Sequence, residues 1–375
     1  MKKILAVLLC TILVLSLFVA CGGNQPAPAT PTPAPAQPAS GAAAGTPAEV
    51  VEVRRVAAIM NIVGVNPFLT QVVDMFEEIY ASGRFPMEYT IIESGDIAAF
   101  GENIRAAVEE GYDLIISIGF QGASAIAEIS QMFPDRADFV IIDTVADSPY
   151  VKSVTFKPSQ AAYLIGVVAG MVSADQGQPM GPFGAVHANP GPASWEWRYG
   201  FMRGVMRVNP AVTPDNFIFN FTSSFTDAAL AKELALAQAA QGAVFINAAS
   251  AVADFGTFEA AFETGFFTSG QDADRTNPDN PNILTTQLKY TGRATELVLE
   301  QFFTTGIVPG VVRLGIEEGG VGAAHITSPG LFRNHDVLTD AIIAEAQQAV
   351  EEMLSGRLVL YPAPSEDDYM ANPYA

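Results

Sequence analysis

The chain has 375 residues, 49% of them hydrophobic, which is long and apolar enough for two packed domains. Its formal net charge of −21 argues against a nucleic-acid partner, because nucleic acids are held by lysines and arginines that neutralise phosphate. The histidines, His187, His325 and His335, are scattered, so neither a histidine metal site nor a nucleophile–histidine pair has local support. We therefore expect no metal, no cofactor and no enzymatic activity.

The N-terminus has the order of an export signal. Lys2 and Lys3 precede an apolar run over residues 4–18, and small residues surround Cys21. A transmembrane anchor is the alternative, but a span needs about 20 apolar residues and this run is shorter. The sequence Phe-Val-Ala-Cys that ends at Cys21 resembles the bacterial lipobox. We expect residues 1–20 to be removed, and lipid on Cys21 to hold the protein at the extracytoplasmic face of the cell membrane.

Residues 21–48 are expected to form the lipidated N-terminus and a linker. This stretch is rich in proline and alanine, with too few large apolar groups to offset the entropy of ordering. Cys10 leaves with the signal and Cys21 carries lipid, so the mature chain has no thiol pair for a disulfide. Stability must come from an ordinary core.

The next part of the chain alternates apolar runs with helical patterns. We expect strands at residues 56–63, 89–93, 113–118, 139–143 and 151–156, and helices at 67–82, 98–110, 123–132 and 159–173. Apolar runs without alternation suit strands that helices cover on both faces. The pattern predicts a parallel α/β sheet.

A second round of the same alternation follows. We expect strands at residues 183–187, 217–221 and 244–247, and helices at 194–208, 227–241 and 256–263. Residues 283–290, 291–305 and 311–316 are expected to return across a hinge as strand, helix and strand, before a last helix at 336–354. Two rounds predict two similar lobes. Ligands of open α/β sheets bind beyond the carboxyl ends of the strands, so the loops there should face one cleft.

Several short segments occur in a recognisable order between residues 56 and 321. They are ESGD at 93–96, NIRAA at 103–107, GYDLI at 111–115, IGF at 118–120, IID at 141–143, SVTFK at 153–157, AYLIGVVAG at 162–170, GFMRGV at 200–205 and EEGGVG at 317–322. Together they resemble the basic membrane protein family of substrate-binding lipoproteins, whose better-known members bind purine nucleosides for ABC importers.

The resemblance implies a type I periplasmic-binding fold, with two Rossmann-like parallel-sheet lobes that close on a ligand about a hinge with chain crossovers. The implied boundaries are 49–158 plus 290–308 for the N-terminal lobe, 159–289 plus 309–330 for the C-terminal lobe, and 331–375 for a C-terminal helix and tail. It also implies a monomeric receptor that performs no chemistry. Such a receptor binds a small polar ligand, above all a purine nucleoside, and presents it to an ABC permease and its ATPase.

The candidate ligand residues of the first lobe lie at strand ends. Asn61 stands where the family has an aspartate, and a polar group that ends an apolar strand is costly unless it is partnered, which favours a cleft role. Asn61 or Asn66 could make paired hydrogen bonds to a base edge. Phe68 keeps a family aromatic and either stacks on a base or staples its helix. Phe120 follows another strand, and Asp143 matches a family acid or caps a turn.

The candidates of the second lobe are two aromatics, an acid and a lysine. Trp197 and Phe225 could close a sandwich on a base, although the core is the default place for such side chains. Asp272, in the segment GQDAD, is the best match for binding vicinal ribose hydroxyls, since a carboxylate can accept two hydrogen bonds; a solvated loop acid is the alternative. Lys289 matches a family lysine and either contacts the ligand or pairs with Asp272.

One loop departs from the family pattern. Where the family often has GGTG, this chain has NAASAVADFG at residues 247–256, a bulkier loop that changes the shape of the pocket. A receptor for a sugar or polyol is therefore an alternative, favoured if the pocket lacks two stacking aromatics. A surface lipoprotein that uses the same fold without transport is another.

Overall fold

The computed structural model describes residues 52–324, 326–328 and 330–360. Cys21, the leader and the linker of residues 21–48 lie outside these residues, so the lipid anchor stays a prediction. None of the helices in the described part of the chain is both long enough and apolar enough to cross a membrane.

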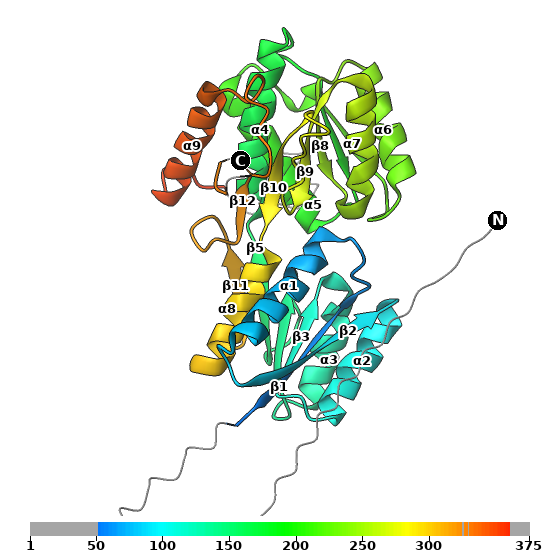
Figure 1. The fold of residues 1–375 in the computed structure, drawn as a ribbon, viewed down its shortest axis with the longest axis vertical. Coiled ribbons are helices and arrows are strands. Elements are labelled where there is room, and N and C mark those ends of the chain that lie inside the picture. Colours follow the sequence, from blue (N-terminus) through cyan, green and yellow to red (C-terminus); the bar gives the residue numbers. More distant parts are fainter. Residues whose placement is uncertain (1–51, 325, 329, 361–375) are drawn as a thin grey trace, which may run out of the picture. The chain divides into compact units, whose positions relative to one another are not determined.

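The first lobe is a parallel sheet with helices on both faces (Figure 1). Along the inner strand β1 (Arg54–Asn61), Val56, Ala58 and Met60 face one core, while Ala57 and Ile59 face the other. This burial on both faces is why the strand is apolar from Val56 to Met60. The strands, in spatial order, are β11 (Gly310–Leu314), β5 (Val151–Phe156), β4 (Asp138–Ile142), β3 (Leu114–Ile118), β1 (Arg54–Asn61) and β2 (Met87–Ser94). One face is covered by α1 (Pro67–Ser82) and α8 (Thr291–Thr304), the other by α2 (Ile97–Glu109) and α3 (Ala123–Met132).

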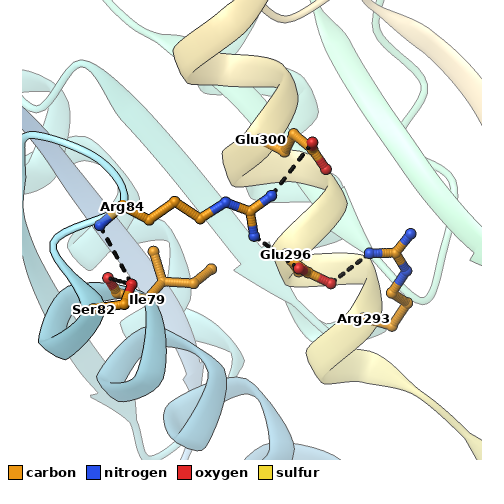
Figure 2. Close-up of polar contacts among 6 residues, drawn as sticks. All are labelled: Ile79, Ser82, Arg84, Arg293, Glu296 and Glu300. Carbon is orange, nitrogen blue, oxygen red and sulfur yellow. Dashed lines mark hydrogen bonds and ion pairs between the residues drawn. The ribbon is translucent and has the colours of Figure 1, made fainter.

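Helix α8 returns from far along the sequence to pack beside α1. Figure 2 shows the polar part of this contact: Arg84, just after α1, pairs with Glu296 at 2.8 Å and with Glu300 at 3.3 Å. Phe85 stacks on Phe303 with ring centroids 4.7 Å apart. Partly exposed ion pairs contribute about 0–1 kcal/mol each, so the apolar contact carries most of the stabilisation of this helix pair.

The second lobe repeats the plan (Figure 1). Its strands, in spatial order, are β12 (Val321–Ala323), β10 (Ile283–Lys289), β9 (Phe267–Asp272), β8 (Phe245–Ala249), β6 (Phe183–His187) and β7 (Phe217–Phe221), with β12 antiparallel to β10 and the others parallel. One face is covered by α4 (Pro158–Asp175), α5 (Pro192–Val208) and α9 (Asp340–Leu354), the other by α6 (Ala228–Ala240) and α7 (Asp254–Thr264). The fold is thus two parallel-sheet α/β lobes, as the sequence predicts.

Two glycines let α4 and α5 approach each other closely. A Cβ on Gly166 would lie 2.1 Å from the carbonyl oxygen of Phe201, and a Cβ on Gly204 would lie 2.0 Å from that of Tyr163. Both distances are far inside van der Waals contact, so only glycine fits. These glycines belong to the segments AYLIGVVAG and GFMRGV, which therefore encode a helix–helix contact of the second lobe.

The chain passes between the lobes beside β5, β10 and β11. The crossing segments are tied together by backbone hydrogen bonds of 2.9 Å from Lys157 N to Leu314 O and from Tyr290 N to Gly320 O. Strand β11 pairs with β5 in the first sheet. The expected assignment of residues 309–330 to the C-terminal lobe is therefore wrong for β11, because the free edge of β5 takes it up before the chain crosses back.

Strand β9 was not among the expected strands. Its sequence, FTSGQD, is short and polar and shows no apolar run. It is nevertheless buried, and its polar groups find partners: Thr268 Oγ1 donates to Ile246 O at 2.7 Å, and Ser269 accepts from Asn247 Nδ2 at 2.9 Å. Neighbouring strands satisfy these groups, and sequence periodicity alone does not reveal such partners.

Candidate ligand-binding cleft

Backbone strain gathers in the loops after the carboxyl ends of the strands. Among the described residues other than glycine, the positive φ angles are those of Asp143 (82°), Ser223 (54°), Ala251 (57°) and Asp272 (70°). They end or follow β4, β7, β8 and β9 respectively. Such conformations cost about 1–3 kcal/mol each and cluster at functional sites. The strain marks the same edge of both sheets at which an open α/β sheet binds its ligand.

Lys289, the last residue of β10, forms an ion pair between the lobes. Its Nζ lies 2.8 Å from Oδ1 of Asp143 in the first lobe and within 5.4–5.7 Å of the ring centroids of Phe68, Phe156 and Trp197. Burial alone would lower the pKa of Lys289, but the carboxylates of Asp143 and Asp272 outweigh it, and the pKa is raised. The lysine is therefore a cation enclosed by rings, and Asp143 rather than Asp272 is its paired acid.

Asp272, at the end of β9, is a buried acid with a free oxygen. The residue is 3% exposed, and its Oδ1 has no hydrogen-bond partner. Burial raises its pKa to about 6, although Lys289 acts in the opposite direction. A carboxylate at this position is ionised at neutral pH and can accept a hydrogen bond from a donor on a ligand.

Neutral hydrogen bonds also join the lobes at this place. Gln71 Nε2, on α1, lies 3.3 Å from the carbonyl oxygen of Asp272 and 3.1 Å from that of Lys289. Within the first lobe, Thr291 Oγ1 at the start of α8 donates to Phe68 O at 2.7 Å, which fixes the start of α1. The start of α1 is thus held against the ends of β9 and β10, and sequence reasoning missed both Gln71 and Thr291.

An aromatic pair faces across the lobes. Phe120 follows β3 of the first lobe and Phe225 follows β7 of the second, and their ring centroids are 6.4 Å apart with an interplanar angle of 41°. Phe120 is 51% exposed and Phe225 is 37% exposed, so part of each ring is open to solvent. The two rings are therefore available as flat surfaces for a planar ligand.

The other predicted aromatics and amides lie differently. Trp197 is 2% exposed and packs in the main core beneath Lys289, so it holds the lysine rather than presenting a free ring. Phe68 is half-buried against the same core. Asn66 caps α1, accepting from Phe68 N at 3.1 Å, and Asn61 is the half-buried last residue of β1.

Another ion pair between the lobes was not expected from the sequence. Arg313, on β11, lies 2.7 Å from Glu196 on α5 and donates to Phe156 O at 3.0 Å. Burial raises the pKa of Glu196, while Arg313 acts to lower it. A lone glutamate in a helix carries no signal that its partner lies on a strand more than a hundred residues away.

Metal ligation has no support within the described residues, where no group of three or more histidine, cysteine, aspartate and glutamate side chains could hold an ion. His187 is buried, and burial lowers its pKa to about 4, which makes it a neutral core residue at pH 7.

Comparisons with known proteins identify the family of the chain and support its fold. The family model described as "ABC transporter substrate-binding protein PnrA-like" matches residues 81–362. Among solved structures, a solute-binding protein of an Aeropyrum pernix ABC transporter system superposes with a TM-score of 0.73 at 20% identity, covering 85% of this chain and 96% of that one. A Conexibacter woesei solute-binding protein gives 0.62 at 22% identity, covering 83% and 99%. These likenesses show the fold.

Sequence relatives match over shorter stretches. The Listeria monocytogenes "CD4+ T-cell-stimulating antigen" is 30% identical over 46% of each chain, so this chain spans about half the length of that relative. The Lactococcus lactis "ABC transporter nucleoside-binding protein BmpA" is 29% identical over 41% of this chain and 42% of its own. Borrelia garinii "Basic membrane protein B" is 25% identical over 62% and 68%. Because the family model covers most of its length, the chain belongs to the family of PnrA-like ABC transporter substrate-binding proteins.

Proposed function

We propose that the protein is the lipid-anchored solute receptor of an ABC importer and that its ligand is a purine nucleoside, bound between the lobes. The observation that carries the proposal is the pair of exposed rings, Phe120 and Phe225, facing each other from opposite lobes. A planar base inserted between them would bury both rings. The nucleoside-binding name of the Lactococcus lactis relative supports the same ligand class.

The polar residues nearby suit the ribose. Asp272 offers an unpartnered carboxylate oxygen to vicinal hydroxyls, and Lys289 beside Asp143 offers a donor from a buried cation. In this proposal the first lobe contributes Asn61, Asn66 and Phe68 to the ligand site. Asn66 caps the helix that carries Phe68. Trp197 supports Lys289 from the core.

Lipid on Cys21 and the linker of residues 21–48 would keep the receptor near the permease and its ATPase at high effective concentration. The relative named "Uncharacterized lipoprotein" from Pyrococcus furiosus, 25% identical over 58% of this chain, supports an anchored, extracytoplasmic receptor. Mass spectrometry of the membrane fraction tests the anchor: a diacylglyceryl modification on Cys21 is expected, and an unmodified or uncut N-terminus would contradict it.

Isothermal titration tests the ligand. The chain from Thr46 onward contains every described residue, and we expect it to bind at least one purine nucleoside while ribose alone binds more weakly, because only the nucleoside carries a base that can stack on the rings. Asp272→Asn should weaken binding by about 10- to 100-fold, since a hydrogen bond to a charged group contributes about 1.5–3 kcal/mol.

The titration also separates the alternative functions. If the titration gives a heat of binding with sugars or polyols and none with nucleosides, the ligand is of the sugar type and not a nucleoside. No binding of either class, together with the absence of a neighbouring permease gene, would favour a surface lipoprotein without transport.

A further inference from the structure

A second buried acid lies beside the proposed ribose site, in the loop where the sequence departs from the family. Asp254 is the first residue of α7 and is 1% exposed. Its Oδ1 accepts from Ser250 N at 2.6 Å, while its Oδ2 has no hydrogen-bond partner. One oxygen thus shapes the loop. The other is a buried polar atom without a structural use, which is costly unless something else binds it.

This loop faces the other lobe. The short helix η3 (Ala251–Ala253), directly before Asp254, lies against α1 of the first lobe. Ala253 N donates to the carbonyl oxygen of Phe225 at 3.0 Å, which ties the loop to the aromatic pair. Ala251 holds one of the strained positive φ angles. Asp254 therefore directly follows a segment that contacts both the loop of Phe225 and α1 of the first lobe.

Asp254 is one of a group of three. Electrostatic interaction links it to Asp272 and to Arg275, and each of the three has a buried polar atom without a partner: Oδ2 of Asp254, Oδ1 of Asp272 and Nη2 of Arg275. Arg275 lies over the ring of Phe255 at 4.6 Å and forms no ion pair among the described residues. These three unpartnered atoms belong to side chains that interact electrostatically, in the segments at and after the ends of β8 and β9, and they indicate a common partner that the chain itself does not supply.

We propose that the two acids divide the recognition of the solute: Asp272 accepts hydrogen bonds as a carboxylate, and Asp254 donates one through Oδ2 as a neutral carboxylic acid. An ionised Asp254 would be a buried charge without an ion-pair partner, which is strongly disfavoured. Burial raises the pKa of Asp254 to about 8, with Asp272 adding to the rise and Ser250 N and Arg275 opposing it. When the surroundings of two acids give them different pKa values, one commonly acts as the ionised acceptor and the other as the neutral donor.

The inference rests on the proposed function and narrows the solute class. The solute must carry hydroxyl donors for Asp272 and, within reach of them, an acceptor oxygen or nitrogen for Asp254. A nucleoside meets both requirements, because its ribose hydroxyls lie next to ether, hydroxyl and base acceptors. Asp254 becomes a specificity residue that the GGTG loop of the family does not provide.

Binding affinity measured against pH tests the division of roles. We expect the affinity of the unmodified protein for the solute that it binds best to fall on both sides of a maximum, below about 6 as Asp272 is protonated and above about 8 as Asp254 ionises. On each side of the maximum, along the acidic and the alkaline limb of the profile, the affinity should fall by up to tenfold per pH unit. Because the two acids interact, the two apparent pKa values of this profile describe the pair and not each acid separately.

Asp254→Asn is the informative variant. Its amide keeps the oxygen that accepts from Ser250 N and replaces the O–H donor by an N–H donor, so binding at neutral pH should persist while the alkaline limb disappears. Glu259→Gln, on the same helix with a side chain 61% exposed, is the matched control and should keep both limbs. An alkaline limb that survives in Asp254→Asn would overturn the proposal.

Stability of the ligand-free protein gives a test that needs no solute. Because the pKa of Asp254 is about 8 in the folded state and 3.8 in the unfolded state, this acid contributes stability below pH 3.8 that is lost progressively as pH rises to about 8. The free energy of unfolding of Asp254→Asn should therefore increase relative to that of the unmodified protein as pH rises from 3.8 to about 8. Parallel stability curves would contradict the neutral buried acid even if binding were intact, whereas failure to bind any nucleoside would contradict only the proposed ligand.

Discussion

Three charged residues of the proposed site, Asp143, Asp272 and Lys289, show how much about a site can be predicted from single side chains. Each of them matches a residue of the family that the sequence resembles, and Asp143 and Lys289 also lie at the ends of expected strands. The resemblance points to these three side chains, but it does not give their pairing. The sequence left Lys289 to contact a ligand or Asp272, whereas its ion pair is with Asp143, since the return of β10 beside the first lobe decides which acid is within reach.

Replacing Lys289 tests this ion pair. Lys289→Met should lower the free energy of unfolding by about 3 kcal/mol, the lower end of the range for breaking a buried pair, because Asp143 keeps part of its hydration with its side chain 21% exposed. Chemical denaturation measures the change. The double variant with Asp143→Asn should recover part of the loss, and strictly additive losses would show that the two residues do not interact.

Elements were predicted well where burial produces a long apolar pattern and poorly where polar groups are satisfied inside the sheet. The runs that became β1, β3 and β4 are buried on both faces and carry that burial in their sequence. Strand β9 hides its polar groups in hydrogen bonds to neighbours. Strand β11 was recognised as a strand and given to the wrong lobe, because the choice of sheet depends on which edge is free.

Contact between α4 and α5 gives a prediction at the scale of elements. Gly204→Ala should lower the free energy of unfolding by about 1–3 kcal/mol, because its Cβ would meet the Tyr163 carbonyl oxygen and force the helices apart. Gly101→Ala in α2 is the control: its Cβ would lie 3.7 Å from Ala125, so it should raise stability by about 0.5–1 kcal/mol. Equal effects of the two variants in denaturation would rule out the tight helix contact.

For the whole molecule, the order of elements predicts the two lobes, and the superposition on solved solute-binding proteins confirms this fold. The features that join the lobes come from residues far apart in sequence, such as Gln71 with β9 and β10, or Glu196 with Arg313. No local pattern encodes these contacts. They gather at the strand ends where the aromatic pair and the buried acids also lie, so the contacts between the lobes and the proposed ligand site form one region.

The most direct test of the central claim is a crystal structure of the protein with a purine nucleoside. The account predicts the base between Phe120 and Phe225, the ribose hydroxyls on Asp272, and Asp254 Oδ2 within hydrogen-bond distance of an acceptor on the solute. A nucleoside bound outside the space between the lobes, or bound there without contact to either ring or to Asp272, would contradict it.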